Sequence, residues 1–296
     1  MTLEIRKNKI EKIICSSALH KLKRKIPYGW DLNIYRGCQN ECKYCYAMYS
    51  HDYLGEDDFS KVFVKTNIVE QLDKELSRLN WKREIINIGG VTDSYQQVEA
   101  EIKIMPEILK TLIKHKNPAI ISTKSVLILR DYELISELAN ITYVNIASTI
   151  TTMDENIRQK IEPHGSKSQD RFNMLREFRK TNASVGLHTM PIIPYLTDSY
   201  SNIEHLCSEA RKSNIHYMLT GVLYLRGATR KAFFGFFKQS YPDKYINLKG
   251  LYRTGGADRS YKERLYNEII NPLREKYGIS NSYTKPMNEK MPGNFN

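Results

Sequence analysis

Long apolar runs are missing from this chain. No stretch of about 18 uncharged apolar residues occurs in its 296 residues, so the sequence offers no helix that would cross a bilayer. The opening segment MTLEIRKNKIEKIICSSALHKLKRKIP is basic, but it lacks the continuous apolar region of a secretory signal. We therefore expect a cytoplasmic protein with no membrane partner.

Acidic residues are the minority among the charges. The chain has 45 Lys plus Arg against 33 Asp plus Glu, a net charge of +12. Its composition, 41% hydrophobic and 26% charged, is that of a globular protein and excludes a disordered chain, a collagen-like repeat or a coiled coil. The length suits one large domain, because a single core grows to about 250–300 residues before chains usually divide. We expect a monomer.

The positive charge is concentrated at the two ends. Residues 1–30 carry eight basic and two acidic side chains, and residues 226–296 carry fourteen and six. Residues 31–225 carry twenty-three and twenty-five. A near-neutral middle between basic ends favours a core that performs chemistry and outer segments that contact a polyanion, most obviously nucleic acid. Basic ends that only keep the protein in solution explain the same pattern.

Cysteines are few, and their spacing excludes a disulfide framework. There are five, an odd number, and Cys38, Cys42 and Cys45 fall within eight residues. Thiolates so close together in one loop are typical of an iron–sulfur cluster, and three ligands leave one iron of a four-iron cluster open to a small molecule. The alternative is a structural zinc with His51 or Cys15 as the fourth ligand, although zinc sites usually separate two Cys pairs by a longer spacer.

The other two cysteines, Cys15 and Cys207, lie in apolar surroundings. Cys15 stands in EKIICSSAL and Cys207 in the helical pattern IEHLCSEA. Both are most simply buried small hydrophobic residues. Donation of a hydrogen atom to a radical remains open for either thiol.

Short β-rich segments alternate with helical segments through the middle of the chain. We expect strands at 31–37, 84–90, 118–123, 141–148, 184–190 and 217–225, and helices at 68–79, 104–115, 131–139, 168–181 and 201–212. This alternation predicts βαβ units and a parallel sheet, an α/β fold.

The cysteine motif, with an aromatic residue before its last cysteine, resembles the signature of the radical S-adenosylmethionine (SAM) superfamily. The segment NIYRGCQNECKYCYA is similar to the branch related to spore photoproduct lyase, often called DNA repair photolyases. The similarity continues in order through 89–99, 122–135, 147–165, 185–194 and 223–237. It implies a partial (βα)6 TIM-like barrel over 31–225, between a basic N-terminal arm at 1–30 and a basic helical extension at 226–296.

The resemblance also implies the cofactors and their ligands. Cys38, Cys42 and Cys45 would hold a 4Fe-4S cluster and form the catalytic centre, with Tyr44 and Tyr46 packed on the cluster or on the adenine of SAM. The reduced cluster would cleave SAM to a 5′-deoxyadenosyl radical that abstracts hydrogen from the substrate. The electron would come from a donor such as flavodoxin or ferredoxin.

Polar residues follow successive predicted strands, at the end where such barrels bind ligands. Gly90, Thr92 and Asp93 follow the second strand, and Val91 stands where the superfamily often has a Glu. The resemblance therefore implies that Thr92 and Asp93 supply the polar contacts to SAM. A turn and helix cap explains the same residues without a ligand.

Two further contacts to SAM are implied at the next strand ends. Lys124 would bind the methionine carboxylate, and Ser148 and Thr149 the ribose hydroxyls, although a solvated surface lysine explains Lys124 equally well. On the fifth strand, His188 and Met190 either face the barrel interior or belong to the core.

The extension at 226–296 combines aromatic and basic residues. Its four phenylalanines, between residues 233 and 237, are expected to dock a helix on the barrel. Lys and Arg interleaved with Tyr are also typical of a surface that binds phosphates and stacks bases. We expect an ordered loop at 250–262 and a loosely held tail at 281–296.

Three functions remain open. The first is a radical SAM enzyme that acts on nucleic acid, in a lyase-like or DNA repair reaction. The second is a radical SAM enzyme that modifies a peptide or small metabolite. The third is a non-enzymatic nucleic-acid-binding protein with a zinc or redox-sensing cluster.

Overall fold

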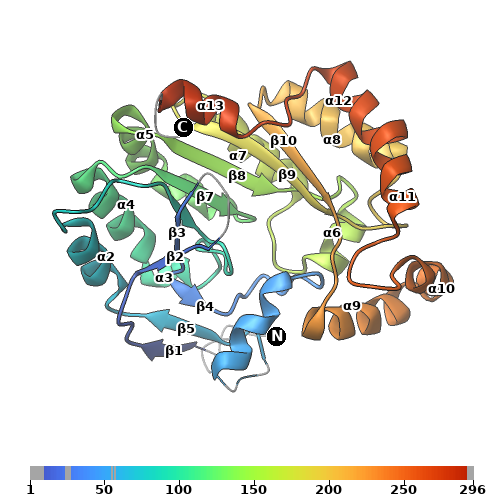
Figure 1. The fold of residues 1–296 in the computed structure, drawn as a ribbon, viewed down its shortest axis with the longest axis horizontal. Coiled ribbons are helices and arrows are strands. Elements are labelled where there is room, and N and C mark those ends of the chain that lie inside the picture. Colours follow the sequence, from blue (N-terminus) through green and yellow to red (C-terminus); the bar gives the residue numbers. More distant parts are fainter. Residues whose placement is uncertain (1–9, 24–27, 55, 57, 292–296) are drawn as a thin grey trace.

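A seven-stranded sheet forms the centre of the computed structural model, which describes residues 10–23, 28–54, 56 and 58–291 (Figure 1). In spatial order its strands are β10 (Tyr217–Val222), β9 (Ser184–Ile192), β8 (Val144–Thr149), β7 (Ala119–Thr123), β6 (Ile86–Ile88), β3 (Trp30–Leu32) and β2 (Leu19–Lys21). Every neighbouring pair is parallel except β2 and β3. The six parallel strands confirm the predicted α/β partial barrel.

Helices cover one face of this sheet. The connecting helices are α2 (Ile68–Leu76), α4 (Ile104–His115), α5 (Tyr132–Ile141), α7 (Ser168–Phe178) and α8 (Tyr200–Lys212). Shorter elements lie in the strand-to-helix connections: α3 (Glu99–Ile102), α6 (Glu155–Ile161) and the 3-10 helices η1 (Tyr46–Leu54) and η2 (Val126–Asp131). In α2, the buried residues Ile68, Leu72 and Leu76 repeat every four positions and form the face that packs on the sheet.

The two faces of the sheet differ in chemistry because side chains alternate along a strand. Ile146, Leu187 and Met218 belong to the hydrophobic core beneath the helices. The alternate positions Asn145 and Tyr217 face the barrel interior, where the Tyr217 hydroxyl donates to Asn145 Oδ1 at 2.9 Å. The interior is therefore polar around Asn145 and Tyr217, which suits a ligand there.

A separate three-stranded sheet flanks the barrel. Its strands are β1 (Ile10–Ile13), β5 (Val62–Lys65) and β4 (Tyr35–Arg36), with β5 in the centre. The prediction of one strand over 31–37 is therefore wrong, because β3 and β4 belong to different sheets. Tyr35 of β4 pairs with Val64 of β5, which follows the three clustered cysteines in the chain, and no local pattern indicates such a pairing.

The described part of the predicted N-terminal arm belongs to the two sheets. β1 pairs with β5, and β2 forms the edge of the large sheet. Buried Glu75 of α2 accepts hydrogen bonds from the backbone N–H groups of Ala18 at 3.1 Å and Leu19 at 2.9 Å. Residues 10–13 and 19–21 are thus held by the barrel, and five of the eight basic residues of the arm lie outside the described residues.

The C-terminal extension is helical, as predicted. It contains α9 (Gly227–Ser240), α10 (Pro242–Leu251), α11 (Arg259–Arg264), the π-helix η3 (Leu265–Ile270), α12 (Asn271–Tyr277) and α13 (Thr284–Lys290). Phe233 and Phe237 are fully buried, which confirms that these rings dock α9. The prediction of a loosely held tail at 281–296 is wrong for α13, because Met287 is fully buried beside Ile120 and Tyr143. Residues 292–296 lie outside the described residues.

No helix among the described residues has the length and apolarity required to traverse a bilayer.

The polar interior depends on a glycine in β9. Tyr217 crosses β9 at Gly186, where an added Cβ would overlap the Tyr217 ring. We expect Gly186→Ala to lower the free energy of unfolding by about 1–3 kcal/mol, since the ring cannot move without losing its bond to Asn145. Urea unfolding of the apoprotein measures this value.

Gly235→Ala is the matched control. Gly235 lies inside α9, and an added Cβ meets no atom within 4 Å. This change should raise the stability by about 0.5–1 kcal/mol, because alanine favours a helix more than glycine does. Equal stability of Gly186→Ala and the parent protein would show that the packing of Tyr217 over β9 does not matter.

Candidate active site

The three clustered cysteines lie on one loop between β4 and η1, called here the cysteine loop (residues 37–45). Backbone hydrogen bonds fasten it on two sides: Cys38 N–H donates to the Phe59 carbonyl at 2.9 Å, and Lys43 N–H to the Ile161 carbonyl at 2.9 Å. The Thr92 hydroxyl donates to the Gly37 carbonyl at 2.5 Å. Segments that are distant in sequence therefore shape the loop.

All three thiols have raised pKa values. Burial raises the pKa of Cys38 and of Cys42 to about 12 and that of Cys45 to about 11. Negative charge adds to the effect, from Asp93 and Cys45 at Cys38 and from Cys42 at Cys45, while Lys124 opposes it at Cys42. These mutual effects show that the thiols share one small region, and metal binding there must release protons because the thiolate is the ligand.

A single metal ion does not fit the described residues. No group of three or more His, Cys, Asp or Glu side chains among them is arranged to hold one. His51 Nε2 contacts the Lys61 carbonyl at 3.0 Å, and the Cys15 thiol donates to Asn67 at 3.3 Å, so among the described residues neither proposed fourth zinc ligand is grouped with the three cysteines. A cluster of several irons accepts more widely spaced thiolates, and a loop with one buried and two partly buried cysteines fits that group.

Asp93 connects the cysteine loop to two strand ends. Its Oδ1 accepts from Tyr95 N–H at 2.9 Å and from the Thr123 hydroxyl at 2.7 Å. Its Oδ2 accepts from Asn40 Nδ2 and from Lys124 N–H, both at 2.8 Å. With four protein donors on one carboxylate, Asp93 acts mainly by positioning, and a direct contact to SAM stays a prediction.

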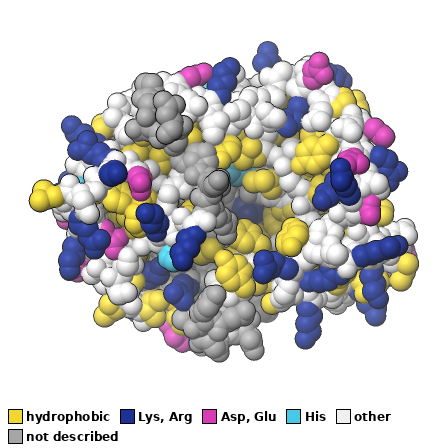
Figure 2. All heavy atoms as spheres, viewed as in Figure 1, with side chains coloured by type: hydrophobic (Ala, Val, Ile, Leu, Met, Phe, Trp, Pro, Cys, Tyr) yellow, Lys and Arg dark blue, Asp and Glu magenta, His cyan; other side chains and the backbone are white. Residues whose placement is uncertain are grey.

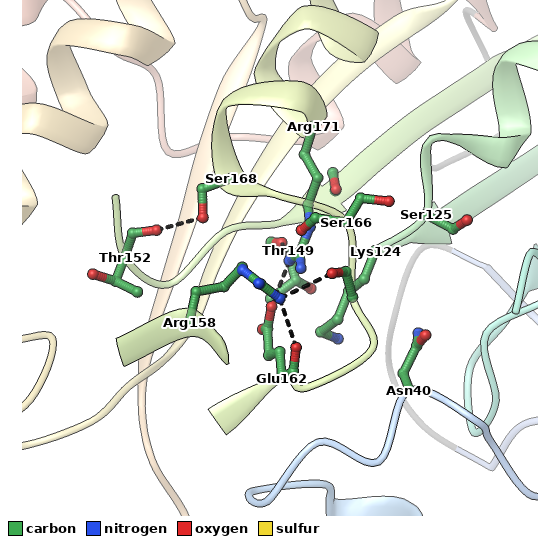
Figure 3. A network of polar contacts seen from close by, with 12 residues as sticks. Asn40, Lys124, Ser125, Thr149, Thr152, Arg158, Glu162, Ser166, Ser168 and Arg171 are labelled. Atoms are coloured by element: carbon green, nitrogen blue, oxygen red, sulfur yellow. Dashed lines mark hydrogen bonds and ion pairs between the residues drawn. The ribbon is translucent and has the colours of Figure 1, made fainter. Parts of the chain in front are cut away.

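Lys124 places a positive charge at the end of β7. Its ammonium lies 5.8 Å from the centre of the Tyr44 ring, and no described residue accepts a hydrogen bond from it (Figure 3). Burial alone would lower the pKa of Lys124, but the negative charges of Cys42, Glu162 and Asp93 raise it above its usual value. An ammonium that is charged and has unused donors beside the cysteine loop fits the predicted role of binding a carboxylate.

A buried acidic residue that sequence reasoning missed holds the aromatic residue of the motif. The Tyr44 hydroxyl donates to Glu162, and Arg171 forms an ion pair with Glu162 at 2.6 Å. Both charged side chains are fully buried. Burial would raise the pKa of Glu162, but Arg171, Lys124 and Tyr44 outweigh it and keep the pKa below its ordinary value.

The fixed partners of Arg171 make this pair rigid. Arg171 also donates to the Ser166 carbonyl at 2.8 Å and to the Thr149 carbonyl at 2.7 Å, and Arg158 donates to the Glu162 carbonyl at 2.8 Å (Figure 3). Tyr44 is thus oriented from the segment after α6. The only sequence signal for Glu162 was its place in the segment 147–165.

Two other predicted contacts differ in their surroundings. Tyr46 lies at the mouth, with a ring that is 59% exposed and a hydroxyl that donates to the Gly90 carbonyl. Ser148 is fully buried, and its hydroxyl donates to the Thr123 carbonyl at 2.7 Å. By the alternation of β8, Thr149 faces the interior and Ser148 faces the helices, so this geometry does not support ribose binding by Ser148.

His188 faces the barrel interior. Its Nε2 lies 3.5 Å from the Tyr217 hydroxyl. Burial, together with the positive charge of Lys124, lowers the pKa of His188 to about 4. The ring is therefore neutral at physiological pH and offers the interior a donor and an acceptor without a charge. Met190, two residues further along β9, is 37% exposed.

The cysteine loop generates a direct prediction. We expect Cys38→Ala, Cys42→Ala and Cys45→Ala each to lose the bound iron and to abolish reductive cleavage of SAM, because no described side chain replaces the missing thiolate. Iron content and 5′-deoxyadenosine formation measure the two effects. Cys15→Ala is the control and should retain both. Cleavage of SAM by all three variants would contradict the assignment.

Lys124 generates a second prediction. Lys124→Ala should weaken the binding of SAM about tenfold or more, since a charge-assisted contact is worth roughly 1.5–3 kcal/mol. Calorimetry on the cluster-loaded protein measures the affinity. Lys160→Ala is the control, because the Lys160 ammonium lies over the Tyr241 ring at 5.1 Å and not beside Tyr44. Unchanged affinity in Lys124→Ala would remove this residue from the site.

Comparisons with known proteins agree with this geometry. Residues 32–226 match the family model of the Radical SAM superfamily. The chain is 32% identical over 278 residues to an uncharacterised protein of Mycobacterium tuberculosis (strain H37Rv), covering 92% of this chain and 82% of that protein. It is 27% identical over 255 residues to an uncharacterised protein of Methanocaldococcus jannaschii, covering 85% and 89%.

Among solved structures, the fold is similar to that of spore photoproduct lyase complexed with dinucleoside spore photoproduct. The TM-score is 0.66 at 13% identity, and the match covers 92% of this chain and 81% of that one. A mutant of that lyase with bound SAM and dinucleoside spore photoproduct matches equally well, with a TM-score of 0.66 at 13% identity and the same coverage. This chain belongs to the radical SAM superfamily, whose enzymes use a 4Fe-4S cluster and SAM.

Proposed function

We propose that this radical SAM enzyme acts on a nucleic acid, in a lyase-like reaction of the kind suggested by the resemblance to DNA repair enzymes. One observation carries the proposal: the basic C-terminal extension packs directly on the cysteine loop. Residues 226–257 contain seven basic side chains and one acidic side chain, and a polyanion binds such a surface through its phosphates.

The contact between the extension and the loop is intimate. The Thr229 hydroxyl of α9 donates to the Cys45 carbonyl at 2.8 Å. Phe233 and Phe237 share a hydrophobic cluster with Cys42 and Tyr44. The helix that presents basic residues therefore also forms one wall of the catalytic centre.

The basic residues of this region point into solvent. Six of the seven are exposed: Arg226, Lys231, Lys238, Lys244, Lys249 and Arg253. Figure 2 shows Lys and Arg side chains over α9–α11 and, near the centre of the same face, a hollow bordered by hydrophobic side chains. A strand bound along this surface would lie next to the hollow.

The chain's own residues bind and orient the cofactors and keep water out. When bound and reduced, the cluster and SAM supply a carbon radical that abstracts hydrogen. Lys124 is placed to bind the SAM carboxylate, and the Glu162–Arg171 pair holds Tyr44 in one orientation. The hydrophobic cluster that includes Cys42 and Phe233 excludes water from one side of the loop, which limits unwanted reactions of a radical.

The similar lyase, whose structure was solved with a dinucleoside spore photoproduct bound, gives supporting context. The likeness at 13% identity concerns the fold, and one fold hosts many reactions. The electron donor remains part of the proposal: a flavodoxin or a ferredoxin, acting on a monomeric enzyme. Because the chain is a radical SAM enzyme, the non-enzymatic zinc protein is no longer an alternative.

The test of the proposed function uses the cluster-loaded enzyme under anaerobic, reducing conditions. We expect deuterium to move from a deuterated DNA or RNA substrate, including ultraviolet-irradiated DNA, into 5′-deoxyadenosine. Binding to oligonucleotides should weaken steeply with salt, as counterion release requires. Transfer from peptides or metabolites alone, or no binding to DNA and RNA at low salt, would contradict the proposal.

A further inference from the structure

An exposed aromatic ring stands on a rigid support beside the catalytic centre. Tyr224 lies two residues after the last residue of β10, Val222, and is 59% exposed. Single exposed apolar residues are ordinary on protein surfaces and need no explanation. Tyr224 differs because the structure beneath it is shaped to hold the ring in place.

The support consists of two consecutive glycines, Gly255 and Gly256. Tyr224 forms an isolated antiparallel bridge with Gly256, and Leu225 N–H donates to the Gly255 carbonyl at 2.6 Å. An added Cβ at Gly255 would lie 2.8 Å from Tyr224 Cζ, and one at Gly256 would lie 3.7 Å from Cδ2. The absence of side chains lets this backbone run along the ring and cover part of it, while the remainder stays open to solvent.

The glycine segment is itself fastened to the molecule. Arg230 donates to the carbonyls of Thr254 at 2.5 Å and Tyr252 at 2.7 Å. The buried Tyr252 donates its hydroxyl to the Leu223 carbonyl at 2.8 Å. Hydrogen bonds thus join residues 252–256 to residues 223–225 and to α9. Because this support is already ordered, binding of a ligand to the ring costs little conformational entropy of the protein.

Positive charges flank the ring. Arg226 is two residues after Tyr224 in extended backbone, so both side chains project to the same side while Leu225 between them is fully buried. Arg253, just before the glycine segment, is also exposed. An open aromatic ring with an exposed arginine on each of the two segments that meet beneath it is the combination with which proteins bind unpaired nucleic acid.

We propose that Tyr224 is a stacking platform for one unpaired nucleobase, with Arg226 and Arg253 contacting the adjacent phosphates. The inference rests on the proposed function and specifies it: the substrate binds as a single strand, or as a duplex opened at one position. The location supports this, since Thr229, which contacts Cys45, lies five residues after Tyr224. A nucleotide next to the stacked base would then lie close to the cysteine loop.

The experiment measures binding of the cluster-loaded enzyme to fluorescein-labelled oligothymidylate, to the corresponding oligouridylate and to a blunt duplex, by anisotropy over a range of salt concentrations. Tyr224→Ala should weaken binding to both single strands about 5- to 100-fold at every salt concentration, because stacking is not an ionic contact. Tyr224→Phe keeps the ring and should bind as the parent enzyme does. Binding to the paired duplex should not change in either variant.

The arginines should respond differently from the tyrosine. Arg226→Ala and Arg253→Ala should each reduce the slope of log affinity against log salt by about 0.7, the value for one phosphate contact on a single strand. Tyr200→Ala is the matched control, since Tyr200 is 49% exposed but begins α8, away from the glycine segment. That variant should bind all three probes as the parent enzyme does.

The outcomes separate this inference from the proposed function. If the parent enzyme and Tyr224→Ala bind single strands with equal affinity, the stacking role of Tyr224 is refuted, while the proposal of a nucleic-acid substrate still holds. Parent enzyme that binds none of the three probes at low salt would overturn both. An equal loss in Tyr224→Ala and Tyr224→Phe would also reject stacking, because the phenylalanine retains the aromatic face.

Discussion

The Asp93 carboxylate connects the parts of the chain that meet at the barrel mouth. Four donors from the cysteine loop, the turn after β6 and the end of β7 converge on its two oxygens. The hydrogen-bonding capacity of this carboxylate is satisfied in the folded protein. Removal of any donor would therefore lower the free energy of unfolding. The position of Lys124 and the shape of the cysteine loop both depend on it.

Buried charges next to this carboxylate set the electrostatics of the site. Glu162 and Arg171 form a fully buried pair, and Lys124 adds a further positive charge near Cys42. Breaking such a pair is strongly unfavourable because one uncompensated charge remains. The pair therefore gives Tyr44 a fixed orientation, and the positive charge of Lys124 lies where three thiolates and a carboxylate ligand would collect negative charge.

The C-terminal extension docks on the barrel and also carries the surface proposed to bind a polyanion, two roles that its sequence presents as alternatives. Phe233 and Phe237 are buried against Cys42 and Tyr44, while the basic residues of the same helices face solvent. Docking and the proposed polyanion binding would use opposite faces of one helix, so neither excludes the other. This arrangement brings the proposed substrate surface next to the catalytic loop.

Features that depend on local spacing could be predicted before the fold was known. Three cysteines within eight residues indicated the cluster, and strands alternating with helices indicated a parallel α/β barrel. Both patterns can be recognised from residues that are close together in the sequence. The docking of α9 was also predictable, since four phenylalanines within five residues must bury part of their surface.

Contacts between residues that are distant in sequence follow from the fold alone. Glu162 lies 118 residues from Tyr44, β4 pairs with a strand beyond the cysteine loop, and Gly255 supports a tyrosine from the end of β10. A buried ion pair or another contact between distant segments produces no periodic pattern in the sequence. The face of β8 on which Ser148 lies follows from the register of the strand. The charge and hydrophobicity of a residue are known from the sequence, whereas the residues that it contacts are set by the fold.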